Sequence, residues 1–365
     1  MSGPLAGIKI VEISATGPVA LFGQMMADLG ATILRVDRPS GMEGRKEGIH
    51  ADNRAVVECD LKNPQVVSWI LDLVRSADVI VEGYRPGVME RLGLGPDVCL
   101  KANPKVVFAR CTGWGQTGPL AQEPGHDLNY LALTGALAAI GPEEEPVVPI
   151  NYVADYGGGA MLLAVGVLAA VISARTTGRG QVIDNAMVDG VGVLDSILYE
   201  LFNSGRWQNR RASNFLDGAA PYYRCYKCAD GKWVAVGSLE MKFRQALAGV
   251  LGVTALGAAS SNDPQNWPAI TAEVAAVFAT ATRDEWMKRM IGKETCCTPV
   301  LDLTEAPHHP HNLARNSFIR APAGGWTPAP APRLSSTPAE RHTAPKVDDV
   351  LAAFGMAKER LAAIA

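Results

Sequence analysis

Apolar residues in the first third of the chain alternate between short continuous runs and longer amphipathic segments. The short runs predict buried strands at residues 8–13, 31–36, 56–59, 78–82 and 105–110. The amphipathic segments 18–29 and 64–75 predict helices, the second of them opened by a proline. Because strands that alternate with helices indicate βαβ units, the pattern predicts an α/β domain with a parallel sheet and ligands at the strand carboxyl ends.

A longer apolar segment, residues 160–174, carries no charge. With the three glycines before it, the uncharged run reaches the length at which a membrane span is considered. The run is solitary and rich in alanine, and Asp155 and Arg175 bracket it. We therefore expect a fully buried helix in a large core and no membrane partner.

The alternating pattern ends after a helical segment near residues 187–204. Residues 222–228 and 232–237, joined through Asp230 and Gly231, predict a β-hairpin with an Asp-Gly turn. Further helices are predicted at residues 243–248, 268–279 and 283–292, with Thr282 as the cap of the last. A proline-rich stretch at residues 322–338 precedes an amphipathic segment at residues 347–362.

These patterns predict two domains. A chain of 365 residues with 48% hydrophobic residues exceeds the usual size of a single core. We expect a large domain at residues 1–186, a helical linker at 187–222, a small α+β domain at 223–318, and a return linker with a C-terminal helix on the large domain at 319–365.

Charge and cysteine usage narrow the function. The net charge is −3 and the basic residues are scattered, which excludes a nucleic-acid binder. The first residues carry neither the basic head nor the cleavage site of a signal peptide, so we expect a cytoplasmic protein. The seven cysteines have no framework spacing and are consistent with free thiols. Cys225 and Cys228 form a C-x-x-C pair without a second spaced pair, so the sequence does not favour zinc.

A literal G-x-G-x-x-G occurs at residues 113–118, directly after a predicted strand. Pro119 and a polar loop follow it instead of a helix, and the turn after the first strand, residues 14–18, lacks the glycine fingerprint. Without a helix N-terminus to receive a pyrophosphate, the motif does not favour a dinucleotide cofactor.

The stretch Gly125–Tyr130 places His126 just before an Ala/Leu-rich segment, so His126 and Asp127 are predicted at a helix N-terminus. The positive helix end favours neutral imidazole, which is the form a general base needs. The alternative is that His126 and Asp127 form a structural cap.

Two carboxylates occupy comparable positions. Asp155 precedes the predicted buried helix. It is either the N-cap of that helix or a functional group whose pKa is shifted in opposite directions by burial and by the helix dipole. The glycines 157–159 leave room for a close approach. Glu240 begins a later helical segment and is either functional or an ordinary helix-start acid.

Basic residues follow three of the predicted strands. Arg38 follows the second strand, Lys62 the third, and Arg85 with Arg91 the fourth. In a parallel sheet these residues reach the same carboxyl edge, where guanidinium and ammonium groups suit a ligand with several phosphates and an adenine. The alternative is that they are solvated charges at the rim.

Seven segments together resemble the α-methylacyl-CoA racemases of the family III CoA-transferase superfamily. They are residues 37–39, 60–62, 83–87, 90–95, 113–119, 125–130 and 155–159. The resemblance covers essentially the whole chain. It implies a Rossmann-like large domain, a small domain, and an interlocked homodimer in which each active site combines the large domain of one subunit with the small domain of the other.

The resemblance also implies residue roles. His126 and Asp155 would be the acid/base pair, and Glu240 the small-domain partner of His126. The coenzyme A and substrate contacts would be Arg38, Cys59, Asp60, Leu61, Lys62, Gly83, Tyr84, Arg85, Arg91, Gly125, Asp127, Leu128, Asn129 and Tyr130. Cys59 replaces the usual alanine, and we expect it to contact the ligand through its backbone.

The implied reaction interconverts (2R)- and (2S)-2-methylacyl-CoA. A thioester acidifies the α-C–H, so one group removes the proton from one face of an enolate and another delivers a proton to the opposite face. A positioned base contributes about 10²–10⁴-fold, and helix ends stabilise the enolate oxygen. Met187 and Leu216 either line the acyl surface or belong to the core. No metal or redox cofactor is required, since coenzyme A is part of the substrate.

Two alternatives stay open. A CoA transferase of the same superfamily would use Asp155 as the nucleophile that forms an acyl anhydride. A non-enzymatic acyl-CoA-binding module would leave His126, Asp155 and Glu240 without a role.

Overall fold

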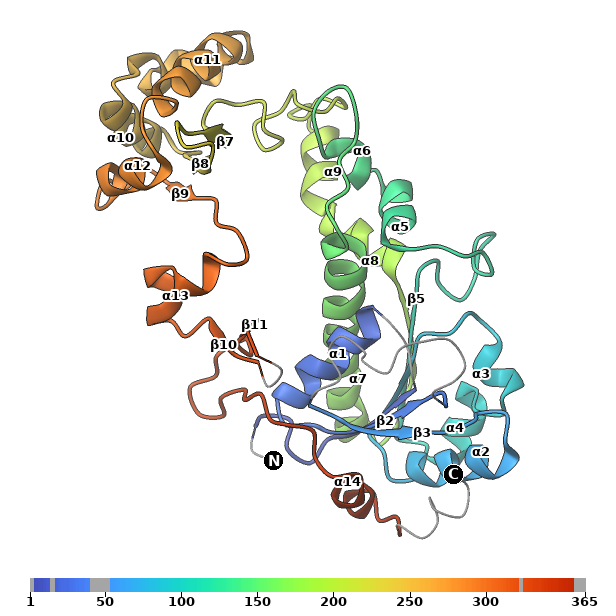
Figure 1. Cartoon of the computed structure of the whole chain (residues 1–365). Coiled ribbons are helices and arrows are strands. Elements are labelled where there is room, and N and C mark those ends of the chain that lie inside the picture. Colours follow the sequence, from blue (N-terminus) through green and yellow to red (C-terminus); the bar gives the residue numbers. More distant parts are fainter. Residues whose placement is uncertain (1–2, 14–16, 40–52, 322–323, 358–365) are drawn as a thin grey trace. The chain divides into compact units, whose positions relative to one another are not determined.

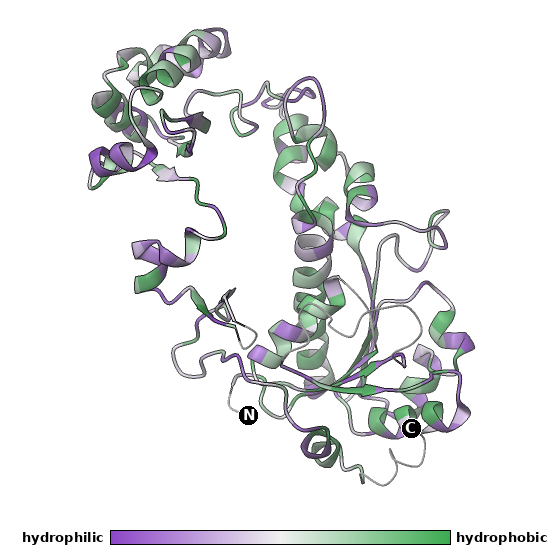
Figure 2. Ribbon diagram, in the orientation of Figure 1, coloured by the Kyte–Doolittle hydropathy of each residue, from purple (hydrophilic) through white to green (hydrophobic). Residues whose placement is uncertain are grey.

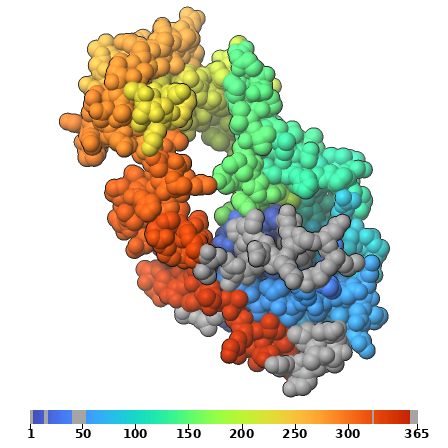
Figure 3. All heavy atoms as spheres, in the orientation of Figure 1, coloured from blue at the N-terminus to red at the C-terminus, as the bar shows by residue number. Residues whose placement is uncertain are grey.

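The computed structural model describes residues 3–13, 17–39, 53–321 and 324–357, which divide into two compact units (Figure 1). Unit 1 comprises Met1–Thr134, Pro149–Ser196 and Pro328–Ala365, and unit 2 comprises Gly135–Val148 and Ile197–Thr327. The orange atoms of Figure 3 belong to unit 2. Residues 14–16 of the predicted first turn and residues 358–362 of the predicted C-terminal helix lie outside the described residues.

Unit 1 is built on a six-stranded parallel sheet in the order β3-β2-β1-β4-β5-β6. The strands are β1 (Lys9–Ile13), β2 (Thr32–Asp37), β3 (Ala55–Glu58), β4 (Val79–Glu82), β5 (Val107–Thr112) and β6 (Val182–Ala186). This is the Rossmann strand order, and the predicted α/β class is confirmed. The pattern analysis missed β6 because this edge strand has one exposed face and carries Asp184 and Asn185.

Helices cover both faces of the sheet. They are α1 (Pro18–Asp28), α2 (Pro64–Val74), α3 (Val88–Arg91), α4 (Pro96–Ala102), α7 (Leu162–Thr177) and α14 (Val347–Ala353). Neighbouring residues of β2 point to opposite faces, so Leu34 packs with Trp69 of α2 and Leu351 of α14, whereas Ile33 packs with Phe22 of α1. Burial on both faces explains why the strands are continuous apolar runs.

Helix α7 continues a π-helix, η1 (Tyr152–Met161), and apolar residues occupy most of it (Figure 2). By length and hydropathy Tyr152–Thr177 passes as a membrane span, yet half of it is buried in the protein. Val167 packs on the sheet, while Val165 is 61% and Ile172 66% exposed. The prediction of a fully buried helix is therefore wrong for the single chain, because a sheet covers only one face of a helix.

Two predicted helical segments are each divided in two. The segment near residues 187–204 forms α8 (Met187–Leu194) and α9 (Ser196–Asn203). The Ala/Leu-rich segment forms α5 (Asp127–Thr134) and α6 (Ala136–Ala139), separated by Gly135 in the left-handed region at φ 96°. Both divisions fall at or next to a boundary between the units.

Unit 2 contains the predicted hairpin, formed by β7 (Tyr223–Lys227) and β8 (Trp233–Gly237), and β9 (Cys297–Pro299) extends it as an antiparallel sheet. Gly231 in the turn has a φ of 79°, as an Asp-Gly turn requires. Helices α10 (Met241–Leu251), α11 (Trp267–Phe278) and α12 (Arg283–Met290) pack on this sheet, and Thr282 and Glu285 form a capping box. The remaining short elements are η2 (Thr254–Gly257), η3 (Ala259–Asn262), η4 (Pro264–Asn266), η5 (Ala306–His308), α13 (Pro310–Ala314), β10 (Phe318–Arg320) and β11 (Trp326–Pro328).

Candidate active site

His126 lies immediately before α5, as the sequence predicts. Its carbonyl oxygen accepts the Asn129 N–H at 2.8 Å, and its own N–H donates to the Asn129 side-chain oxygen at 3.0 Å. The cap of α5 is therefore made by the His126 backbone and by Asn129. The His126 side chain is exposed and is not needed for capping.

Tyr130 holds the segment that precedes α5 in place. Its hydroxyl donates to the Gly125 carbonyl oxygen, and its ring packs edge-on against Trp114 at a centroid distance of 4.8 Å. A Cβ atom at Gly113 would collide with the Tyr130 ring. The glycine of the G-x-G-x-x-G motif is thus required by an aromatic side chain and not by a pyrophosphate. Burial raises the pKa of Tyr130 to about 12, so its hydroxyl stays a donor.

Asp127 joins the two predicted reacting segments. Its Oδ2 accepts the N–H groups of Ala154 at 2.9 Å and Asp155 at 2.7 Å, so the buried carboxylate of α5 caps the start of η1. Asn151 is the N-cap of η1, and Asp155 lies inside its first turn. Asp155 is therefore not the N-cap, and its carboxyl group is free of that role. The resemblance implied a ligand contact for Asp127, but its side chain is engaged in the protein.

The environment of Asp155 shifts its proton affinity. Burial, and secondarily the negative charge of Asp127, raises the pKa of Asp155, while the Asn151 hydrogen bond at 3.4 Å and the charge of His126 oppose this shift. A Cβ atom at Gly17 would lie 3.3 Å from Asp155 Oδ2, so backbone closely approaches the carboxyl group. A half-buried carboxyl group with a raised pKa stays protonated to higher pH than an ordinary aspartate, which suits it to proton transfer.

The glycines 157–159 make room for protein rather than for ligand. A Cβ atom at Gly158 would lie 2.8 Å from the Val191 N atom of α8, and one at Gly157 2.9 Å from the Leu194 side chain. These close contacts hold α8 against the wide turns of the π-helix. π-Helical turns are frequent at functional sites, and here they carry Asp155.

The carboxyl edge of the sheet gathers part of the predicted coenzyme A site. Arg38, after β2, stacks on the Tyr84 ring, after β4, at 5.3 Å. Lys62 after β3, Arg85 after β4 and Arg91 at the end of α3 are also exposed. The positive charge of Arg85 reaches Tyr130 and lowers its pKa against the larger effect of burial.

The segment after β3, residues 59–62, is another part of the predicted coenzyme A site. Cys59 and Leu61 are buried in the hydrophobic core, and burial raises the pKa of the Cys59 thiol. The Cys59 N–H donates to the Asp37 carbonyl oxygen at 2.8 Å, and Asp60 Oδ1 accepts the Lys62 N–H at 2.9 Å. Neither the Cys59 nor the Leu61 side chain is available to a ligand. The backbone contact expected of Cys59 stays a prediction.

A partly buried ionic network that the sequence analysis missed holds the Gly83–Arg91 segment. Arg110 of β5 donates from Nε to Glu82 at 3.0 Å and from both Nη atoms to Glu90 at 2.9 and 3.0 Å. Glu82 in turn accepts the Tyr84 N–H at 2.6 Å. Arg110 therefore ties both ends of the loop that carries Arg85 and Arg91. An arginine within a buried strand was the available signal, because a buried charge needs partners.

Glu240 belongs to unit 2, where it is the N-cap residue of α10. Its side chain is exposed and makes no capping hydrogen bond, so it is not a helix-start acid in the usual sense. Buried Arg244 donates to the carbonyl oxygens of Ser238 at 3.2 Å and Leu239 at 2.7 Å, which fixes the turn before Glu240. The pairing of Glu240 with His126 stays a prediction.

Metal-binding geometry is absent from the part of the chain that the structure describes, where no three His, Cys, Asp or Glu side chains cluster in a way that could hold an ion. In the C-x-x-C pair, Cys225 is exposed and Cys228 is buried.

Comparisons with known proteins give the family and the fold of the chain. Residues 5–349 match the profile of CoA-transferase family III. The α-methylacyl-CoA racemases of Mus musculus and Homo sapiens are 41% and 38% identical to this chain over 336 and 364 residues, which cover 92% and 98% of this chain and 87% and 95% of those proteins. A CaiB/BaiF family protein from Brucella suis has the same fold, with a TM-score of 0.80 at 22% identity over 97% of this chain and 99% of its own.

Proposed function

Since the chain belongs to CoA-transferase family III, and its relatives at 38–41% identity are α-methylacyl-CoA racemases, we propose that it interconverts the (2R) and (2S) forms of 2-methylacyl-CoA thioesters. The observation that carries the proposal is the pair of adjacent helix starts bearing His126 and Asp155, bridged by the buried Asp127 carboxylate. A base and an acid held at two neighbouring helix starts are what inversion at one carbon requires.

In the proposed mechanism His126 removes the α-proton of one enantiomer, and Asp155 delivers a proton to the opposite face of the enolate. The raised pKa of Asp155 keeps a fraction of it protonated at higher pH than an ordinary aspartate. For the other enantiomer the roles are exchanged. The N–H groups at the start of α5 stabilise the negative charge on the thioester oxygen. Both steps are proton transfers, so the proposal needs no metal or redox cofactor.

The coenzyme A part of the substrate would bind at the carboxyl edge of the sheet. Arg38, Lys62, Arg85 and Arg91 supply positive charge for the phosphates, and the Arg38–Tyr84 pair offers flat groups for the adenine. The loop from Gly83 is already held by Arg110, which lowers the entropy lost on binding.

We further propose an interlocked homodimer in which Glu240 of one subunit reaches His126 of the other. The exposed apolar side chains of α7 and α9 support an extensive subunit contact. They include Val165, Ile172, Ile197, Tyr199 and Phe202. Co-expressing His126→Ala chains with Glu240→Ala chains tests this arrangement, because each mixed dimer that folds from both chains would contain one intact site. Activity in the purified mixed dimer is expected, and its absence would show that both residues act within one chain.

The reaction itself is tested by deuterium incorporation from D2O into a single enantiomer of 2-methyldecanoyl-CoA. Exchange at the α-carbon with loss of optical purity is expected for the native protein, and its loss in His126→Ala and Asp155→Ala while coenzyme A still binds. His311→Ala, an exposed histidine of α13, is the matched control and should behave as the native protein. The less supported alternative, a CoA transferase, predicts transfer of coenzyme A to an added carboxylic acid without α-proton exchange.

A further inference from the structure

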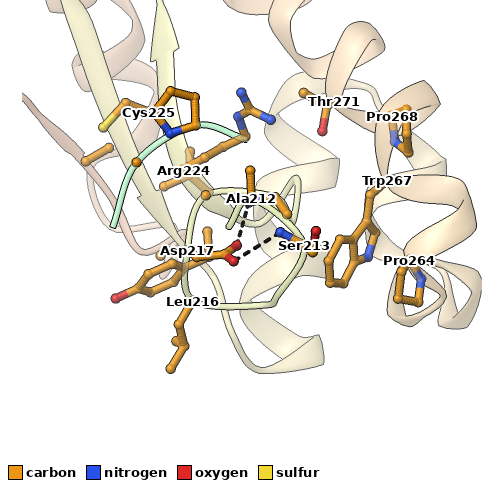
Figure 4. A pocket seen from close by; sticks show the side chains of 18 of the residues that line it. Ala212, Ser213, Leu216, Asp217, Arg224, Cys225, Pro264, Trp267, Pro268 and Thr271 are labelled. Atoms are coloured by element: carbon orange, nitrogen blue, oxygen red, sulfur yellow. Dashed lines mark hydrogen bonds between the residues drawn. The ribbon is translucent and has the colours of Figure 1, made fainter. Parts of the chain in front are cut away.

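Polar side chains hold irregular backbone in place in both units. In unit 2, Asp217 accepts the N–H groups of Ser213 and Asn214 at 3.0 Å and so organises a loop that lines a cavity of about 1170 Å³ (Figure 4). In unit 1, the half-buried amide of Asn185 has a comparable role. Its partner is the π-helix that carries Asp155, so this second case bears on the candidate active site.

Asn185 lies near the carboxyl end of β6, on the face of the strand that packs against α7. Ile183, two residues earlier and therefore on the same face, packs against the core cluster that contains Val167 of α7. The Asn185 Nδ2 atom donates to the Gly159 carbonyl oxygen at 3.2 Å and to the Cys111 sulfur of β5 at 3.5 Å. The amide thus links the sheet to the end of η1.

The Gly159 carbonyl group lies where the π-helix passes into the α-helix. Leu162, the first residue of α7, donates its N–H to the same oxygen. Because hydrogen bonds span five residues in a π-helix and four in an α-helix, the regular ladder is interrupted at this junction. A Cβ atom at Gly159 would lie 2.8 Å from Pro18 Cβ of α1 and 3.1 Å from Met187 Cγ of α8. The junction is therefore closely packed, and Asn185 adds a side-chain donor to it.

Asp155 lies four residues before Gly159, between two anchors. Asp127 accepts the N–H groups of Ala154 and Asp155 at the start of η1. Asn185 holds the other end of η1. We propose that Asn185 is a positioning residue of the proposed racemase, which keeps the π-helical turns in place and with them the direction of the Asp155 carboxyl group. An α-helix turns by about 100° per residue, so a change of one residue in the hydrogen-bond register moves Asp155 to another side of the helix. The inference rests on the proposed function.

The test is the initial rate of α-proton exchange in D2O, measured separately with (2R)- and (2S)-2-methyldecanoyl-CoA. Asp155 removes the proton of one enantiomer, which Asp155→Asn identifies, so a displaced Asp155 slows that enantiomer more than the other. Asn185→Leu keeps a similar size but removes the donor, and we expect it to change the ratio of the two rates at least fivefold in the direction of Asp155→Asn. Val182→Thr, on the exposed face of the same strand, is the matched control and should keep the native ratio. Equal slowing of both enantiomers, or native rates for both, would overturn the inference, because a general loss of stability does not favour one enantiomer.

Backbone amide hydrogen exchange tests the hold of Asn185 without a substrate. The amides of residues 156–161 in η1 should exchange at least tenfold faster in Asn185→Leu and in the smaller variant Asn185→Ala than in the native protein, while those of α2 stay unchanged. Native protection of η1 in either folded variant contradicts the positioning role. Absence of α-proton exchange in the native protein instead contradicts the proposed function, so the two failures are distinguished.

Discussion

Replacing Asp127 by asparagine tests how the two reacting groups are held together. The substitution keeps an amide oxygen in place of Oδ2, which accepts the N–H groups of Ala154 and Asp155 at 2.9 and 2.7 Å, but removes the charge. Hydrogen bonds to a charged group exceed neutral ones by about 1 kcal/mol each, so two of them predict a loss of about 2 kcal/mol in the free energy of unfolding. Urea unfolding at neutral pH measures this loss.

The same substitution acts on the chemistry. Because the Asp127 charge helps to raise the pKa of Asp155, its removal lowers that pKa. The limb of the pH–rate profile that Asp155 controls should therefore move to lower pH for both enantiomers in the deuterium exchange assay. Asp97→Asn, an exposed aspartate in the first turn of α4, is the matched control and should change neither quantity. Native stability together with a native pH profile in Asp127→Asn would refute the bridging role.

Three further substitutions have distinct expected outcomes. Asp155→Asn removes a carboxyl group whose pKa is raised in the folded state, so that its ionised form destabilises the fold at pH 7. The melting temperature of the variant should therefore exceed that of the native protein at pH 7. This gain should vanish below the unfolded-state pKa of 3.8. Arg110→Met frees the loop that carries Arg85, and KM for the acyl-CoA should rise about tenfold with a smaller change in kcat. Arg244→Met loosens the turn before Glu240 and should lower the deuterium exchange rate while coenzyme A binding, measured by calorimetry, is unchanged.

Most of unit 1 follows from local patterns. Five of its six strands are continuous apolar runs because both sheet faces are covered, and the hairpin of unit 2 is marked by its Asp-Gly turn. The sixth strand, β6, has no such run because it carries Asp184 and Asn185, and Val182 and Asp184 on one of its faces are exposed. The sequence pattern also did not predict the exposed face of α7, because an apolar composition does not show how much of a helix the rest of the chain covers.

The candidate site, too, has residues that local sequence predicts and contacts that it does not. His126, Asp155 and the basic residues after the strands were predicted from their positions at helix starts and strand ends, because those positions are local properties of the chain. The two hydrogen bonds of Asp127 were not predicted, because their donors, Ala154 and Asp155, are 27 and 28 residues away. The ion pairs of Arg110 that hold the Gly83 loop were not predicted either, because Glu82 and Glu90 are 28 and 20 residues away.

The sequence by itself determined which elements form and which residues stand at their ends, since hydrophobic periodicity and capping act over a few neighbouring residues. Only the tertiary structure decided that the carboxylate of α5 closes the first turn of the π-helix and that Asp155 lies within that turn instead of capping it. It also decided that the glycines before α7 serve the packing of α8. These are pairings between distant segments, and the burial that shifts the pKa of Asp155 exists only once those segments have packed together.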